Sequence, residues 1–454
     1  MKRPMPLEER QCRLDALRTQ YDALLTTSIA DKTARLAALT AQIEDPSTAP
    51  GKLIDLNADR DKLVANWDKI TKPEMKKLAS RIRQGEEDLE LAPAFDLASY
   101  DKVLVQLSGG KDSVACLLHI LEVMGIDWAK KHVELWHQDI DGGRQFMDWP
   151  ITTAYCRAVA QSFGLPLLVQ YREGGFEQEM LRDGSQNTGV VFYDTLEGET
   201  VNVPTAAEKK LATMERNRDS KKTAKGRASW QAKIDAFLAS DQKVGKKNRV
   251  VLQWPALGDL SQGRWCSAYL KIMVCDQVIN NDSRFEGIKT LVVTGERWEE
   301  SSNRSGYVEH ARHGSNLDNA RVVHQWRPVL DYTEMDVWET LQRNGVVAHP
   351  AYHLGFGRVS CMFCIFGNAD QFKTASLLDP HRFNKMVEYE KQMDHTVKGD
   401  ISLADLVRKG TAYVMQPSMA ALAMNDYYDV RDITCMPSDW VLPAGAFKEC
   451  GGPS

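Results

Sequence analysis

The chain has 454 residues, of which 43% are apolar, with a net charge of −5 and nine cysteines. This length predicts two or three domains, and the apolar fraction is enough for a substantial core. There is no run of 18 or more apolar residues, and the first residues lack an apolar signal region, so we expect no membrane contact and a cytoplasmic location. Nine cysteines in such a chain are expected to be core thiols, metal ligands or nucleophiles rather than a disulfide scaffold.

Residues 1–95 are predicted to form a helical N-terminal arm. Apolar residues recur every three or four positions from Leu14 to Ile43, as in an amphipathic helix. The proline-rich stretch 45–51 ends this helix, and two further helices are expected up to about residue 90. Two interpretations stay open: a helical hairpin packed on the next domain, or a coiled-coil arm that binds a partner.

Strand-like and helical patterns alternate from about residue 100. The apolar or β-branched runs are 103–107, 133–137, 167–171, 290–294 and 321–324, and helical patterns cover 113–124, 151–163 and 267–280. This alternation predicts an α/β fold with a doubly wound parallel sheet and helices on both faces. We expect the α/β domain at 96–204 and 251–375, interrupted by a basic helical insertion at 205–250 and followed by a mainly helical region at 376–454.

The loop after the first predicted strand has the sequence Ser-Gly-Gly-Lys-Asp-Ser. A strand that turns through two glycines into a helix directs backbone N–H groups and the positive end of the helix dipole to one point, which suits a polyphosphate. The alternative is a plain strand-to-helix turn. The loop does not have the spacing of a Walker loop, and no Gly-x-Gly-x-x-Gly fingerprint follows a strand. The candidate nucleotide-binding residues here are Ser108, Gly109, Gly110, Lys111, Asp112 and Ser113.

Other polar residues follow later strands of the predicted sheet. Because ligands of such sheets bind beyond the carboxyl ends of the strands, we expect Asp139 and Gly295 at the same crevice, although Asp139 fits a turn equally well. Arg297, Arg304 and Lys271 are cations suited to phosphate or sulfate, with ion pairing to nearby glutamates as the alternative. His310 and His313 are interpreted as ordinary surface histidines.

The cysteines include one closely spaced pair. Cys361-x-x-Cys364 brings two thiols together, a spacing used by zinc, iron–sulfur and redox sites. Cys266 is the most plausible third ligand. Cys275 is nine residues further on, half a turn away if one helix spans both, so Cys435 or an open site is the alternative for the fourth position. A second group of cysteines, predicted to be core residues in helix interiors, is Cys12, Cys116 and Cys156.

The insertion is the most basic part of the chain. Residues 205–249 contain 13 Lys and Arg against five Asp and Glu, a net charge of +8, which leaves −13 for the remainder. Its lysines and Trp230 suit contact with the phosphates and bases of DNA or tRNA, whereas the alternative is a solvated helical insertion.

The loop at 108–113 resembles the PP-loop of the ATP pyrophosphatase superfamily. The blocks that follow, Arg264-Trp265-Cys266-Ser267, Gly295-Glu296-Arg297 and Cys361-Met362-Phe363-Cys364, occur in an order that resembles the phosphoadenosine phosphosulfate (PAPS) reductase family and its DndC-like branch. The resemblance covers about 100–370 without the insertion. It implies an adenine nucleotide alpha-hydrolase-like fold, ATP with Mg²⁺, and a [4Fe–4S] cluster on Cys266, Cys275, Cys361 and Cys364, with zinc as the alternative. It also implies companion subunits of the Dnd or ParB-like type.

Three functions agree with this sequence. The first is an ATP-dependent sulfurtransferase that forms AMP and pyrophosphate, with Lys111 and Asp112 as candidate catalytic residues. The second is a sulfonucleotide reductase, because Glu449-Cys450-Gly451 resembles the catalytic tail of PAPS reductases. In that tail a cysteine thiolate attacks the sulfate sulfur, and the resemblance implies this role for Cys450. The third is a nucleotide sensor without catalytic activity in a regulatory or defence complex.

Overall fold

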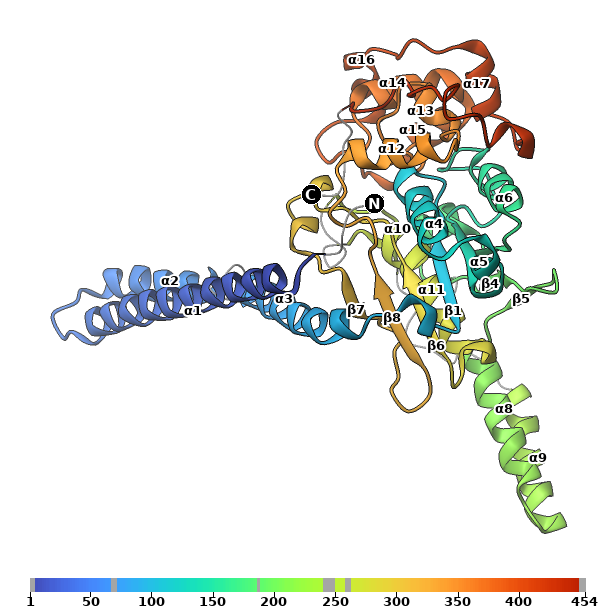
Figure 1. The fold of residues 1–454 in the computed structure, drawn as a ribbon. Helices are drawn as coiled ribbons and strands as arrows, with labels where there is room; N and C mark the ends of the chain where they lie inside the picture. The colour runs from blue at the N-terminus through green and yellow to red at the C-terminus, as the bar shows by residue number, and fades with distance from the viewer. Residues whose placement is uncertain (1–4, 67–71, 186–187, 240–249, 258–262, 449–454) are drawn as a thin grey trace.

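The computed structural model describes residues 5–66, 72–185, 188–239, 250–257 and 263–448 (Figure 1). An eight-stranded sheet forms the centre, in the order β5-β4-β3-β2-β1-β6-β8-β7. Its strands are β1 (Lys102–Gln106), β2 (Val133–Asp139), β3 (Leu167–Arg172), β4 (Val191–Asp194), β5 (Thr200–Asn202), β6 (Lys289–Val293), β7 (His310–Arg312) and β8 (Val322–Trp326). The five strands β3, β2, β1, β6 and β8 are parallel, whereas the edge strands β5 and β7 and the penultimate strand β4 pair antiparallel. The predicted doubly wound α/β fold is confirmed.

Both faces of the sheet are covered because its central strands are apolar on both sides. Val103 and Val105 of β1 belong to the larger core cluster, whereas Leu104 between them belongs to a second cluster on the opposite face. The larger cluster contains α4 (Lys111–Met124), α6 (Thr152–Phe163) and α12 (Glu334–Arg343), and the second contains α11 (Met273–Asn281). The remaining helices of the domain are α5 (Ile126–His132), α7 (Gly175–Met180), α10 (Trp265–Ser267), α13 (Pro350–His353), α14 (Ala369–Leu378), α15 (Pro380–Met393), α16 (Leu403–Lys409) and α17 (Pro417–Ala423).

The helix α12 begins where the sequence indicates. Thr333 is its N-cap, and the Thr333 side chain accepts from Asp336 N while the Asp336 carboxylate accepts from the backbone N–H of Thr333. This reciprocal pair is a capping box, and it satisfies N–H groups that a helix start leaves without partners. α12 packs against α4. The cap therefore also fixes the start of α12 near the loop that precedes α4.

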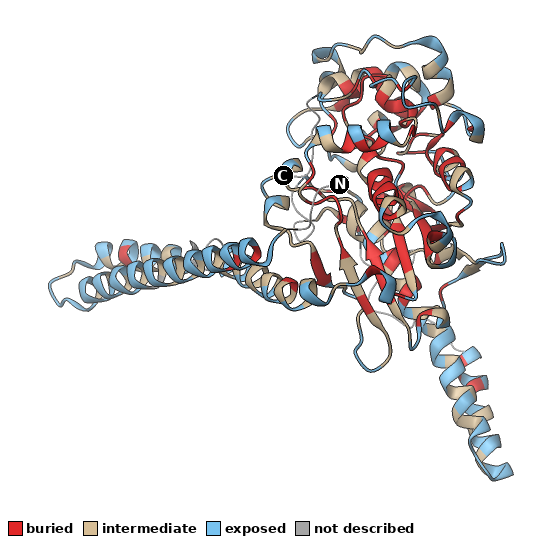
Figure 2. Ribbon diagram, viewed as in Figure 1, coloured by how far each residue is buried: buried red, intermediate tan, exposed pale blue. Residues whose placement is uncertain are grey.

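Two helical elements project from the domain (Figures 1 and 2). The N-terminal arm comprises α1 (Leu7–Glu44), α2 (Pro50–Asn66) and α3 (Lys72–Leu91), and α1 packs against both of the others. The helical insertion forms a hairpin of α8 (Ala206–Asp219) and α9 (Ala224–Ala239). Both elements are largely exposed in Figure 2. Of the two interpretations of the arm, a helical hairpin packed on the next domain describes only its base, because the remainder extends outward in Figure 1.

Two predictions about single residues were wrong. Cys12, expected in the core, is exposed on α1. His310, expected at the surface, is 4% exposed, and its backbone N–H donates to Asp88 of the arm at 2.9 Å. Within the described residues, no helix is both long and apolar enough to cross a membrane.

Candidate functional site

The loop between β1 and α4 is closed by its own serines. Ser113 Oγ accepts from the backbone N–H of Ser108 at 3.2 Å and donates to the carbonyl of Gly110 at 2.8 Å. Gly109 has φ +79°, a conformation that favours glycine, whereas an added Cβ would make only an ordinary contact with Cys156 Sγ at 3.4 Å. The loop therefore delivers the amino end of α4 to the carboxyl edge of the sheet.

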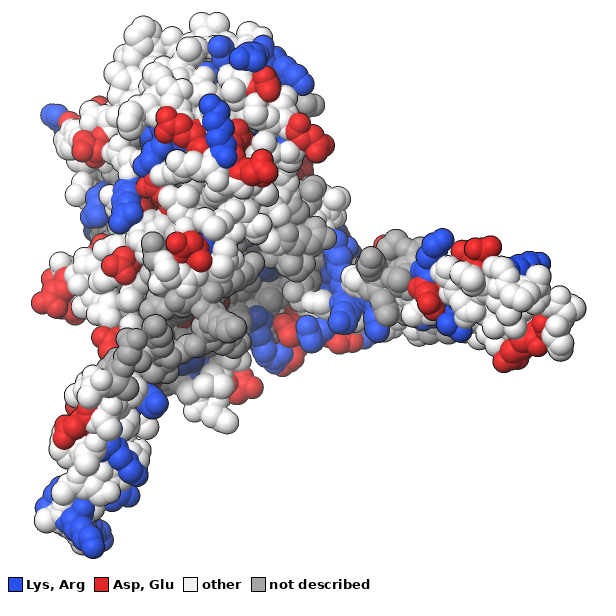
Figure 3. Space-filling model, turned by 180° about the vertical axis from the view of Figure 1, so that it is seen from behind, with Lys and Arg blue, Asp and Glu red and all other residues white. Residues whose placement is uncertain are grey.

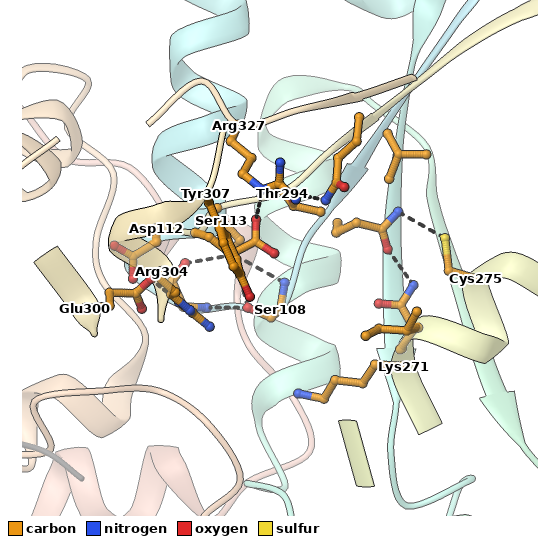
Figure 4. A pocket seen from close by; sticks show the side chains of 18 of the residues that line it. Ser108, Asp112, Ser113, Lys271, Cys275, Thr294, Glu300, Arg304, Tyr307 and Arg327 are labelled. Atoms are coloured by element: carbon orange, nitrogen blue, oxygen red, sulfur yellow. Dashed lines mark hydrogen bonds and ion pairs between the residues drawn. The ribbon is translucent and has the colours of Figure 1, made fainter. Parts of the chain in front are cut away.

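A cavity of about 550 Å³ opens at this edge (Figure 4). Ser108, Gly110, Asp112 and Ser113 of the loop line it, and Gly295 lines it at the end of β6. An added Cβ on Gly295 would lie 2.9 Å from the backbone carbon of Asp112, so β6 approaches the loop closely. Other residues that line it are Gln84, Lys271, Cys275, Glu296, Glu300, Arg304, Tyr307, Arg327 and Arg358. The size suits a nucleotide, and the position is where open α/β sheets bind their ligands.

Two of the arginines at this cavity are held by carboxylates. Arg304 pairs with Glu300, and Arg327 Nε lies 3.3 Å from Glu296 Oε2. In Figure 4 the Glu300–Arg304 pair lies to one side of Ser108, and Lys271 to the other. An anion in the cavity would meet guanidinium groups whose charge is already partly compensated, so its binding requires exchange of partners.

Arg297 does not line the cavity but fixes the loop from behind. Its Nε donates to Asp112 Oδ1 at 2.6 Å, and the residue is 3% exposed. Although burial raises the pKa of the Asp112 carboxyl, the charges of Lys111 and Arg297 hold it below its usual value. Asp112 is therefore an anion at the rim of the cavity.

Lys111 turns away from the cavity and is not among its lining residues. Its Nζ lies 3.4 Å from Asp112 Oδ2 and 3.9 Å from Glu334 Oε1, and 5.7 Å from the ring centres of both Trp338 and Tyr352. The backbone N–H of Lys111 donates to Tyr352 Oη at 3.0 Å. Contact between Lys111 and a phosphate therefore needs its ammonium group to leave Glu334.

Asp139 occupies a turn. Its Oδ1 accepts from Asp141 N at 2.9 Å and its Oδ2 from Gly143 N at 2.7 Å, and it is not among the residues lining the cavity. Of the two interpretations of this residue, the turn is the one that the hydrogen bonds support.

The four predicted cysteine ligands are not assembled into one site. Cys275 belongs to the apolar cluster on the α11 face of the sheet, where its sulfur accepts from Gln106 Nε2 at 3.6 Å. Burial, and after it the negative charge of a Cys364 thiolate, raises the pKa of Cys266 to about 11, which places these two sulfurs near each other. In the described part of the chain, no group of three or more His, Cys, Asp or Glu side chains is arranged to hold a metal ion. The residues therefore do not fit the predicted cluster in this arrangement, and Cys450 lies outside the described residues.

A π-helical turn separates the first two of these cysteines. The residues Ala268–Ile272 form it between α10 and α11, so Cys266 and Cys275 do not share one continuous α-helix. The sequence-based estimate of half a turn between them assumed such a helix and does not apply.

Gln84 is one of the lining residues that the sequence did not indicate, as are Tyr307 and Arg327. It lies on α3 of the N-terminal arm and reaches the cavity from outside the α/β domain. No motif surrounds it, and only the docking of the arm brings it there.

A loop at a helix start, above the carboxyl ends of parallel strands and beside a cavity with arginines, is the arrangement with which α/β proteins bind nucleotides. The model of the phosphoadenosine phosphosulfate reductase domain matches residues 102–366. The chain belongs to this family.

Individual relatives match shorter parts. An uncharacterized 37.8 kDa protein of Escherichia phage 186 is 25% identical over 138 residues, which are 30% of this chain and 40% of that protein. An adenosine 5'-phosphosulfate reductase of Burkholderia cepacia is 33% identical over 72 residues, which are 16% of this chain and 27% of that enzyme. The chain thus spans less than half the length of these relatives. Among solved structures, Candida glabrata FMN adenylyltransferase aligns over 73% of this chain and 70% of its own, at 10% identity and a TM-score of 0.25, which is too low to support an argument.

Proposed function

We propose that the protein is an ATP-dependent sulfurtransferase that cleaves ATP between the α and β phosphates, forms AMP and pyrophosphate, and modifies nucleic acid. The observation that carries this proposal is the complete Ser-Gly-Gly-Lys-Asp-Ser loop, whose residues Ser108, Gly110, Asp112 and Ser113 line the cavity at the carboxyl edge of the sheet. An enzyme that receives a sulfonucleotide already made has no need of a loop for ATP cleavage.

The chain's own residues suit the binding and orientation of ATP. The start of α4 and the Ser108 hydroxyl face the phosphates, and Arg304 and Arg327 compensate the charge that develops on the leaving pyrophosphate. An acceptor oxygen attacks the α-phosphorus, and the bond from this phosphorus to the bridging oxygen breaks, so the electron pair leaves with pyrophosphate. A sulfur nucleophile at the oxidation level of hydrosulfide then attacks the acceptor carbon, and AMP leaves with the former acceptor oxygen. Mg²⁺ enters with ATP, and no step depends on an iron–sulfur cluster or zinc.

The basic hairpin supports nucleic acid as the acceptor. The turn between α8 and α9 carries the exposed residues Lys221 and Lys222, and the first turn of α9 adds Lys225 and Arg227. Figure 3 shows Lys and Arg side chains gathered at the hairpin tip. Such a tip suits a phosphate backbone. Trp230 is less suited to stacking on a base than expected, because Lys233 Nζ already lies 4.4 Å from its ring centre. The hairpin projects away from α12–α17 in Figure 1, so an acceptor that contacts its tip and the cavity must be long. Companion subunits stay a prediction.

A second candidate is sulfonucleotide reduction, and one contact favours it. The backbone N–H of Phe447 donates to Glu334 Oε1 at 3.2 Å, and this same oxygen lies 3.9 Å from Lys111 Nζ. The described part of the C-terminal segment therefore ends next to the loop. Cys450 is two residues beyond Lys448 in the sequence, so it stays the candidate nucleophile of this second function.

The test is anaerobic incubation with α-labelled ATP and Mg²⁺, with and without DNA or tRNA, followed by separation of AMP from ADP. We expect AMP and pyrophosphate, more of both with nucleic acid, and loss of AMP formation in Ser108→Ala and Lys111→Ala. Unchanged AMP formation in both variants would refute the sulfurtransferase. If no AMP forms under any condition and Cys450→Ser abolishes sulfite release from a sulfonucleotide, the reductase replaces it. Binding of ATP without conversion in either assay would leave a nucleotide sensor.

A further inference from the structure

One face of α3 contacts the α/β domain from Lys77 to Asp88. Lys77, Arg81, Gln84 and Asp88 follow the spacing of three and four residues that places side chains on one side of a helix. Each of them faces the domain: Lys77 and Arg81 bond to Asn303, Gln84 lines the nucleotide cavity, and Asp88 accepts from the backbone N–H of His310. The arm is therefore part of the wall of the cavity.

The segment 297–308 lies between the arm and the cavity. Lys77 Nζ donates to Asn303 Oδ1 at 2.6 Å, and Arg81 Nη2 donates to the Asn303 carbonyl at 3.2 Å. The next residue, Arg304, and then Tyr307 line the cavity. The two arm cations thus hold the backbone from which Arg304 reaches the cavity.

A buried ion-pair network fixes the base of the arm. Arg10 of α1 is 5% exposed, and its Nη1 donates to both carboxylate oxygens of Asp88 at 2.6 and 2.7 Å. Its Nη2 donates to Glu309 Oε2 of the domain at 2.5 Å. In addition, Arg13 Cζ lies 3.8 Å from the ring centre of Trp298. One arginine thus joins two helices and the domain, and the base of the arm contacts the segment 297–308 at Trp298 and the residue after its end, Glu309.

We infer that the N-terminal arm completes the nucleotide site: Gln84 contacts the bound nucleotide, and Lys77 and Arg81 are positioning residues that place Arg304. This inference rests on nucleotide binding as proposed above. It adds that nucleotide binding and arm docking are coupled, and the coupling must act equally in both directions.

The test is calorimetric titration with α,β-methylene-ATP and Mg²⁺ of the full chain and of Gln84→Ala, Arg81→Ala and Arg83→Ala. Arg83 is the matched control, since it is an arginine of the same helix and its side chain is exposed. We expect Gln84→Ala and Arg81→Ala each to raise Kd about tenfold, as for the loss of one hydrogen bond in the site, and Arg83→Ala to leave Kd unchanged.

Hydrogen exchange gives a second measurement that does not depend on the variants. The nucleotide analogue should slow amide exchange over 77–88 in the unmodified chain, because occupancy of the cavity stabilises the docked arm. Equal Kd in the wild type and both site variants, with exchange over 77–88 unaffected by the analogue, would overturn the inference. Absence of binding by the wild type would instead refute the proposed function, so the two failures are distinct.

Discussion

Replacement of Arg297 by methionine tests whether the loop depends on its buried ion pair. Arg297 Nε and Asp112 Oδ1 are 2.6 Å apart, with side-chain exposures of 4% and 17%. Removal of one partner of a buried pair costs about 3–5 kcal/mol, because the other charge stays in a poorly solvated place. Lys111 Nζ remains 3.4 Å from Asp112 and compensates part of this loss. We therefore expect Arg297→Met to lower the free energy of unfolding by about 3 kcal/mol.

The assay is urea denaturation at pH 7 without nucleotide, followed by circular dichroism. The matched control is Arg408→Met, because Arg408 also pairs with an aspartate, at 2.8 Å, but is 77% exposed; we expect a change below about 0.5 kcal/mol there. The double variant Arg297→Met/Asp112→Asn should lose about 1–2 kcal/mol less than the sum of its single variants. A loss below about 1 kcal/mol in Arg297→Met would refute the reasoning, because the pair would then behave like a solvent-exposed ion pair.

Two further predictions concern stability. Gly142 has φ +61°, and an added Cβ would lie 2.5 Å from the Arg172 carbonyl, whereas Gly143 has φ +79° and open space around it. We expect Gly142→Ala to lower the free energy of unfolding by about 3 kcal/mol and Gly143→Ala by about 1 kcal/mol, measured by urea denaturation. Equal losses in the two variants would contradict the steric argument. Burial lowers the pKa of His349 to about 3, below its unfolded value of about 6.5. The neutral side chain therefore makes its full contribution to the free energy of unfolding above pH 6.5, and this contribution is lost as the pH falls towards 3. Below pH 6.5 stability should fall by about 1.4 kcal/mol per pH unit from this residue, and an unchanged pH slope in His349→Asn would show that another group is responsible.

The central strands and the loop could be predicted because their signals are local. Runs of apolar residues gave β1, β2, β3, β6 and β8 to within two residues, since these strands are buried on both faces. The antiparallel strands β4, β5 and β7 were missed because they have three or four residues and are largely polar or partly exposed.

Other features depend on contacts that no local pattern encodes. The burial of His310 comes from Asp88, 222 positions away, and the orientation of Lys111 comes from Glu334 on α12. Gln84 enters the site only because α3 docks on the domain. The spacing of the cysteines indicated proximity for Cys361 and Cys364, but it gave no information on the packing that buries Cys275 against the sheet.

The length of α1 has a mechanical consequence. The helix is anchored near its amino end through Arg10, and its 38 residues extend over about 57 Å. A tilt of about 5° at the base therefore displaces the far end by about 5 Å, roughly the pitch of one helical turn. Conversely, a modest force at the far end produces a large torque at Arg10 and Asp88. The arm thus has the geometry of a lever whose short end lies at the cavity wall.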